Sequence, residues 1–334
     1  RKAVLELVRT YRKVSGYVLT SIRDTPLATS AIFDDFGLPK QNPIKLRMFN
    51  ESTVIVLTWD HRRDWINGGD RLLLGDHHNF FSGELIRPHF LVSHYGAEVM
   101  VDSTLQWKLL KFEDGSLLDS GEINAISCFT GEVKEIGIVE VRSPDVLQPT
   151  KVEFIVELSD CRNSVKNLWE FYIFPIPSLS KEEQTSYLID DPLGIFLGLE
   201  SWFPSFKKEV YQLNGEYQPK VVLTSVLRQE HMDFLSRGCK VFYVQRGEGH
   251  FPVKKMPFWR ESLQLFHNHP LMCAFPHENH TGIALLGLAT DTVFEKQALP
   301  DHTSIMERLD ARKFELDSYL FEASVGSGKL VSST

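Results

Sequence analysis

Five side chains near the start of the chain have the chemistry of a sugar-binding site. Tyr17 and Thr20 lie in an apolar run, and Arg23, Asp24 and Thr25 follow it directly. Sugars bind through hydrogen-bond donors and acceptors together with an apolar surface on which they stack. We therefore predict that these five residues line a sugar subsite. The alternative for Arg23 and Asp24 is a structural ion pair at the end of a strand.

A helix and a strand would position this group. Residues 1–13 have the apolar spacing of an amphipathic helix, at Val4, Leu7, Val8 and Tyr11. Ser15-Gly16 would end the helix, and residues 17–22 then predict a buried strand. Polar residues just after the carboxyl end of a strand are typical of the active-site face of an α/β barrel.

Residues 1–45 are accordingly interpreted as the last helix and strand of a truncated (β/α)8 barrel. A lone helix and strand cannot bury their apolar faces by themselves. Arg1 already lies in the helical pattern with no capping residue before it. We expect the chain to be a piece of a longer protein, and the alternative is a short decoration on an otherwise complete one.

The rest of the chain divides into two further expected domains. Residues 46–178 contain short alternating apolar runs between turn signals, which predict an all-β immunoglobulin-like sandwich. The expected strands include residues 53–58, 90–95, 105–109, 136–141, 152–158 and 167–174, with a hairpin turn at 113–116. A polar linker is expected at 178–185.

Residues 188–334 are predicted to form an α/β domain with a parallel sheet. The order is a strand at 220–224, a short helix at 229–236 that ends at Gly238, and a strand at 240–245. Residues 320–332 predict two strands around Gly326 and Gly328. The sequence there lacks the first glycine and the Ser/Thr of a phosphate-binding loop, so a hairpin turn is favoured.

Histidine-rich and tryptophan-rich stretches are other possible sites. Residues 59–65 hold two tryptophans and favour a contact between domains, and His77-His78 favours a solvated loop. Four histidines crowd one segment, at His267, His269, His277 and His280. Their spacing is not that of a zinc protease, so we expect a polar loop and no metal, with a zinc site as the alternative.

The four cysteines do not form a recognisable site. They are Cys128, Cys161, Cys239 and Cys273, without CxxC spacing. We expect buried free thiols, with a Cys128–Cys161 bridge as the alternative. Neither Cys239 nor Cys273 has the flanking glycines of a nucleophile elbow, so the α/β domain is expected to be catalytically silent.

Composition excludes some partners. A net charge of −8 argues against nucleic acid, which requires a basic surface. The sequence contains no run of about 18 apolar residues, which is the length needed to span a membrane. Cellular compartment and oligomeric state stay undetermined, and a homo-oligomer is possible.

The order of motifs resembles glycoside hydrolase family 2, which includes β-galactosidases, β-glucuronidases and β-mannosidases. The matching motifs are the Gly16-Tyr17 strand, Asp24, Asp34, the Pro39-Lys40 pair, Trp107, Asn167 to Trp169, and Phe174-Pro175. Ala31 stands where the family usually has glycine. Residues 238–243 and 269–281 resemble a C-terminal module similar to the flavodoxin-like or class I glutamine amidotransferase-like fold.

The resemblance implies the C-terminal part of a retaining β-glycosidase that needs no cofactor. In such enzymes two glutamates, about 5 Å apart, act as acid/base and nucleophile. Both belong to earlier barrel strands, upstream of Arg1. We therefore assign no catalytic residue, and expect a carbohydrate substrate and the missing N-terminal barrel of the same chain as partners. This piece alone is predicted to be inactive.

Two other functions stay open. One is a non-catalytic carbohydrate-binding or interaction protein whose parent has lost its acid/base pair. The other is an amidotransferase-like sensor confined to residues 190–334.

Overall fold

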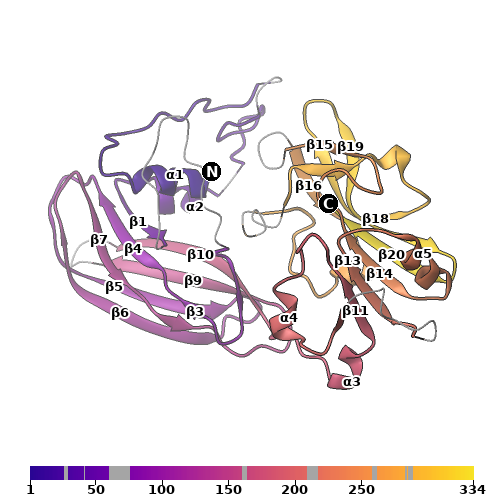
Figure 1. The fold of residues 1–334 in the computed structure, drawn as a ribbon. Coiled ribbons are helices and arrows are strands. Elements are labelled where there is room, and N and C mark those ends of the chain that lie inside the picture. The colour runs from indigo at the N-terminus through magenta and orange to yellow at the C-terminus, as the bar shows by residue number, and fades with distance from the viewer. Residues whose placement is uncertain are drawn as a thin grey trace. The chain divides into compact units, whose positions relative to one another are not determined.

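A computed structural model describes residues 1–25, 29–40, 42–59, 76–159, 164–208, 217–257, 262–282, 284 and 289–334. The chain divides into two compact units, Arg1–Pro175 and Ile176–Thr334. Strands make up most of the regular structure of both (Figure 1). Among the described residues, no helix is both long and apolar enough to cross a bilayer.

Unit 1 combines two helices with a β-sandwich. The helices are α1 (Lys2–Arg9) and α2 (Pro43–Asn50), which lie beside β1 and β10 (Figure 1). The strands are β1 (Thr53–Thr58), β2 (Asn79–Phe81), β3 (Leu85–Ile86), β4 (His89–His94), β5 (Met100–Lys111), β6 (Leu117–Cys128), β7 (Glu132–Ile138), β8 (Val141–Arg142), β9 (Thr150–Ser159) and β10 (Ser164–Phe174). One sheet has the order β1-β4-β7 and the other β2-β10-β9-β5-β6, and β3 pairs with β8.

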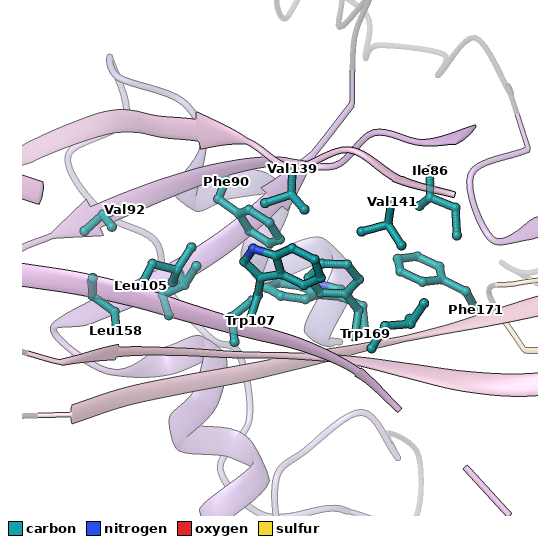
Figure 2. Packing of buried hydrophobic residues seen from close by; sticks show 14 of the residues in the cluster. Ile86, Phe90, Val92, Leu105, Trp107, Val139, Val141, Leu158, Trp169 and Phe171 are labelled. Atoms are coloured by element: carbon teal, nitrogen blue, oxygen red, sulfur yellow. The ribbon is translucent and has the colours of Figure 1, made fainter. Parts of the chain in front are cut away.

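The inner faces of the two sheets bury one shared aromatic and aliphatic core. Along β9, the predicted alternation is confirmed, because Val152, Phe154, Val156 and Leu158 are all buried. Phe90 of β4 packs against Trp169 of β10 with ring centroids 5.9 Å apart. Figure 2 shows these rings gathered with Trp107 between the strand layers. The pattern of period two therefore located the sandwich correctly.

The prediction for the first 25 residues was wrong in two respects. Residues 17–22 form no strand, and Val18 and Ile22 are 88% and 70% exposed. In α1 the buried side chains are Leu5 and Glu6, whereas Val4 is 55% exposed. The face of α1 that turns inward therefore differs from the predicted apolar stripe, because the Glu6 carboxylate contacts the sandwich there.

Unit 2 contains one large sheet with few helices. Its helices are α3 (Lys181–Gln184), α4 (Leu199–Trp202) and α5 (Gln229–Ser236), with 3₁₀ turns η2 (Pro270–Met272) and η4 (Lys296–Ala298). Its strands are β11 (Tyr187–Asp190), β12 (Lys207–Lys208), β13 (Val221–Thr224), β14 (Lys240–Val244), β15 (Val253–Lys255), β16 (Ser262–Phe266), β17 (Thr292–Phe294), β18 (Thr303–Asp310), β19 (Glu315–Val325) and β20 (Gly328–Ser333). The predicted helix at 229–236 is confirmed.

The sheet of unit 2 is mixed. Strands β12, β11, β13, β14 and β20 are neighbours in that order and run parallel. The sheet then continues through antiparallel pairs of β19 with β20, β18 and β17, and of β16 with β18. The sheet is therefore not the parallel flavodoxin-like sheet that the sequence predicted, because many of its strand pairs are antiparallel. Strand periodicity alone does not give the direction of a strand.

Two glycine turns and one linker can be compared with their predictions. Gly115 and Gly326, with φ of 69° and 60°, lie in the expected β5–β6 and β19–β20 hairpins. The expected linker at 178–185 contains α3, which is held by a capping box between Ser180 and Glu183. A polar composition thus concealed a short helix.

Candidate functional site

The described residues 22–25 and 29–40, here called the exit loop, are joined to one another by backbone hydrogen bonds. Asp24 N donates to Phe33 O at 2.9 Å, and Phe33 N donates to Ile22 O at 2.9 Å. Phe33 also forms a bridge to Pro39. The loop is irregular in shape, but its two limbs are joined.

Asp24 lies at the centre of the exit loop and both of its carboxylate oxygens are engaged. Oδ1 accepts a hydrogen bond from Ala31 N at 2.9 Å, and Oδ2 forms an ion pair with Lys40. The Asp24 side chain is only 8% exposed. The hydrogen bond from Lys40 lowers the pKa of Asp24, and the bond from Ala31 acts in the same direction. The carboxylate therefore stays ionised and braces the loop.

Arginine side chains also hold exit-loop carbonyls. Arg23 donates from Nε to Asp35 O at 2.9 Å. Arg1 donates from Nη2 to Ala31 O at 2.8 Å and also to Ser30 O. Ala31 itself is fully buried. Arg23 thus makes a structural contact, as the alternative to sugar binding predicted. Its partner is the backbone carbonyl of Asp35 and not the Asp24 carboxylate.

The remaining predicted sugar ligands lie apart from this brace. Tyr17 OH donates to Asn50 Oδ1 at the end of α2. Thr20 and Thr25 are exposed. All five predicted residues are described, and no hydrogen bond or ion pair joins any two of their side chains. The structure leaves two threonine hydroxyls open to solvent and uses the other three groups internally.

The exit loop and the residues before it expose several large apolar side chains. Val18 and Phe36 are 88% and 82% exposed, and Ile22 and Leu38 are 70% and 63% exposed. We call these four residues the apolar loop residues. Val18 precedes the exit loop, and the other three project from the exit loop, whose limbs are joined by backbone hydrogen bonds.

A buried carboxylate that the sequence did not reveal attaches this region to the sandwich. Glu6 of α1 accepts from Asn167 Nδ2 at 2.6 Å and from Trp169 Nε1 at 3.1 Å. Lys2 forms an ion pair with Glu6 and lies 4.5 Å above the Trp169 ring. Nothing in a helical pattern marks Glu6 as buried, because its partners are more than 160 residues away.

A second polar group lies in unit 2, where β11 ends. Asp190 Oδ2 is 3.0 Å from Arg228 Nη1 and 3.2 Å from His231 Nε2. His231 is completely buried, and its Nδ1 accepts from Arg228 N at 3.1 Å. The group links the start of α5 to β11, and a buried imidazole cannot meet a substrate. We assign it a structural role.

The histidine-rich segment forms no described metal site. His267 Nε2 is 2.6 Å from Glu307 Oε2, and Lys296 Nζ is 2.5 Å from Oε1. Burial acts to raise the pKa of Glu307, but the bonds from Lys296 and His267 outweigh it and lower that pKa. Within the described ranges, no group of three His, Cys, Asp or Glu side chains could hold a metal ion.

The expected solvated loop at His77-His78 is wrong, because both imidazoles are partly buried against unit 1. His77 stacks on Trp59 at 4.9 Å, and burial lowers the pKa of His77 and of His78. Residues 60–75, which carry the rest of the tryptophan-rich stretch, lie outside the described residues.

Two of the described cysteines lie in environments unlike that of a nucleophile. Cys239 is buried before β14, and burial raises its pKa to about 11. Cys128 is also buried and free, with its pKa raised to about 11 by burial. Cys273 is free and exposed, and Cys161 lies outside the described residues.

A family model described as a domain of unknown function (DUF8488) matches residues 84–175. This stretch runs from β3 to the end of the sandwich. No curated protein matches the chain. The domain model names no activity.

Several solved structures are similar to the chain at low identity. Spo0M, a sporulation control protein from Bacillus subtilis, is 10% identical with a TM-score of 0.26, over 37% of this chain and 49% of that one. A β-glucuronidase from glycoside hydrolase family 2 is 11% identical with a TM-score of 0.24, over 50% and 19%. The β-glucuronidase of Parabacteroides merdae is 9% identical with a TM-score of 0.21, over 48% and 22%. The chain spans half or less of the length of each, and likenesses this low carry no information on activity.

Proposed function

We propose that this chain is a non-catalytic C-terminal part of a retaining β-glycoside hydrolase of the family 2 type. Its accessory units would support the catalytic barrel and the substrate cleft. The sequence resemblance supports the type of reaction. The exit loop supports the role of this part of the protein.

The apolar loop residues carry the proposal. Three large apolar side chains exposed on this loop, with Val18 exposed just before it, are typical of a contact with another protein surface. The loop is held in shape by Asp24, Lys40 and Arg23, and these contacts leave its apolar side chains exposed. We infer that the missing N-terminal barrel covers Val18, Ile22, Phe36 and Leu38, so that residues 1–45 complete it.

The predicted sugar ligands take different roles in this proposal. The exposed hydroxyls of Thr20 and Thr25 would face the carbohydrate at the barrel mouth. Tyr17, Arg23 and Asp24 would hold the segment in place through Asn50, Asp35 and Lys40. We expect no cofactor, and the two catalytic glutamates would precede Arg1.

Unit 2 would serve as an accessory module of the amidotransferase-like type. The parallel order β12-β11-β13-β14-β20 supports this, because a 2-1-3-4-5 order is that of flavodoxin-like sheets. Cys239 and His231 are both buried in this unit, and the exposed Cys273 lacks the flanking glycines of a nucleophile elbow. A separate sensor activity is therefore the weakest of the three functions.

The test compares the complete reading frame with residues 1–334 on a panel of chromogenic β-glycosides. We expect the complete protein to cleave at least one substrate and residues 1–334 to cleave none. Phe36→Glu in the complete protein should lower activity, whereas Leu147→Glu, at a fully exposed position, should not. A folded complete protein that cleaves no glycoside but binds sugar would favour the non-catalytic alternative.

A further inference from the structure

Two short stretches of the chain have the acceptor pattern of N-linked glycosylation, which is Asn-x-Ser/Thr without proline at the middle position. They are Asn50-Glu51-Ser52 in unit 1 and Asn279-His280-Thr281 in unit 2. The pattern alone is common, so the surroundings of each asparagine must distinguish them. A bulky oligosaccharide has to lie outside the folded chain, which requires an exposed asparagine whose amide the fold does not use.

The side chain of Asn279 meets both conditions. Asn279 is exposed, and its φ of 62° lies in the left-handed region that asparagine adopts more readily than most residues. Its backbone amide donates to His277 Nδ1 at 3.1 Å, and its carbonyl accepts from Phe266 N at 3.0 Å. Among the described residues, no hydrogen bond engages its side-chain amide. The fold therefore holds the backbone of Asn279 and leaves its amide open to solvent.

The surroundings of Asn50 are different. Asn50 is half-buried at the end of α2, and its Oδ1 accepts a hydrogen bond from Tyr17 OH. Two residues later, Ser52 O accepts from Arg9 Nη2 at 3.0 Å. These contacts join the first helix and the segment after it to the start of the sandwich. An oligosaccharide on Asn50 would crowd them, so the folded chain has room for a sugar chain at Asn279 and little at Asn50.

The Asn279 stretch also lies along the edge of the unit 2 sheet. Strand β16 pairs with β18 on one side. On its other side, Leu265 forms an antiparallel bridge to His280. Thr281 N donates to Gln264 O at 2.9 Å in the same place. An exposed sheet edge accepts further strands unless something blocks it, and an oligosaccharide here would block it.

We propose that Asn279 is the acceptor of an N-linked oligosaccharide, added by an oligosaccharyl transferase in a secretory compartment. The amide Nδ2 forms a bond to the anomeric carbon of a lipid-pyrophosphate-linked oligosaccharide. The bond between that carbon and the pyrophosphate oxygen breaks, the pyrophosphate leaves on its lipid, and the amide releases one proton. This modification is independent of the glycosidase activity proposed for the parent protein.

Thr281 allows the pattern to be removed without touching Asn279. Thr281 is 4% exposed, and its Oγ1 has no hydrogen-bond partner among the described residues. Because a buried hydroxyl without a partner adds no stability, Thr281→Val should fold while it destroys the pattern. Thr281→Ser keeps the hydroxyl and therefore keeps the pattern. The burial of Thr281 also implies that the transfer takes place before this loop has folded.

The test is expression of the full chain behind a cleavable signal peptide in cultured animal cells. We expect peptide:N-glycosidase to increase the gel mobility of the natural chain and to convert Asn279 to Asp in most molecules, as read by peptide mass spectrometry. Asn279→Gln and Thr281→Val should both lose the mobility change. Thr281→Ser and the matched control Asn50→Gln should keep it.

Three results would overturn the proposal. They are a chain without sugar on Asn279, a chain with sugar on Asn50 alone, and a mobility change that Thr281→Val leaves intact. Chain that the cells retain is digested with endoglycosidase H and scored in the same way, so poor secretion does not hide the result. Circular dichroism of Thr281→Val checks that the loss of sugar does not come from misfolding.

Discussion

Single residues decide how the first 45 residues hold together. The most informative are two carboxylates with different surroundings. Asp24 braces the exit loop near its surface, and Glu6 is buried between α1 and the sandwich. The sequence predicted Asp24 as a site residue, because it follows the expected strand, but gave no signal for Glu6.

Replacement of Asp24 by Asn should open the exit loop and remove its response to acid. The folded pKa of Asp24 lies below its ordinary value, so its stabilising effect is present at neutral pH and is lost as pH falls through that folded pKa. Hydrogen exchange at the Ala31 amide measures the opening. Protection in the natural chain should fall in acid, while Asp24→Asn should show low protection that no longer changes with pH. Equal protection in both proteins would contradict the brace.

Replacement of Glu6 by Ala should destabilise unit 1 by about 2–4 kcal/mol, because Asn167 and Trp169 would lose a charged acceptor in a buried site. Denaturant unfolding followed by tryptophan fluorescence gives the free energy. Glu51→Ala is the control, since Glu51 pairs with Arg47 on the surface and should cost less than about 0.5 kcal/mol. A similar loss in both variants would mean that the Glu6 contacts add nothing.

At the level of elements, periodicity and turn chemistry predicted most of what formed. The sandwich strands, the 229–236 helix and the glycine hairpins followed from local pattern, because alternation and positive φ are properties of short segments. The 17–22 strand did not form, since a strand requires a neighbour in register and none is present among the described residues. The same limit explains why the antiparallel pairs of β18 with β16 and β19 were not predicted, although the β19–β20 hairpin was.

The β19–β20 hairpin packs so closely on α5 that Gly328 accepts no side chain. A Cβ there would lie 2.4 Å from the carbonyl oxygens of Cys239 and Leu235. Gly328→Ala should therefore destabilise unit 2 by about 1–3 kcal/mol, because backbone atoms must move. Gly198→Ala, where nothing lies within 4 Å, should be nearly neutral. Chemical denaturation monitored by circular dichroism compares the two, and equal midpoints would disprove the close approach.

At the level of the whole molecule, the two units contain separate cores and a buried thiol each. Cys128 belongs to unit 1 and Cys239 to unit 2, and both are nearly inaccessible. Site-resolved alkylation at pH 8 should label Cys273 before Cys128 and Cys239, because Cys273 is exposed and burial raises the pKa of the other two described thiols to about 11. Along a denaturant series, Cys128 and Cys239 should then report the opening of their own units. Immediate labelling of either in native buffer would show that its core is open.

The amino-acid order alone determined the β-rich architecture of the chain and its main turns. These depend on periodicity, glycine φ angles and residue chemistry, all of which act over a few neighbours. Only the tertiary structure decided that Asp24 is held by Lys40 and that Glu6 is buried against Trp169. Such contacts join residues far apart in the chain, and their free energy depends on burial and register that no local window contains.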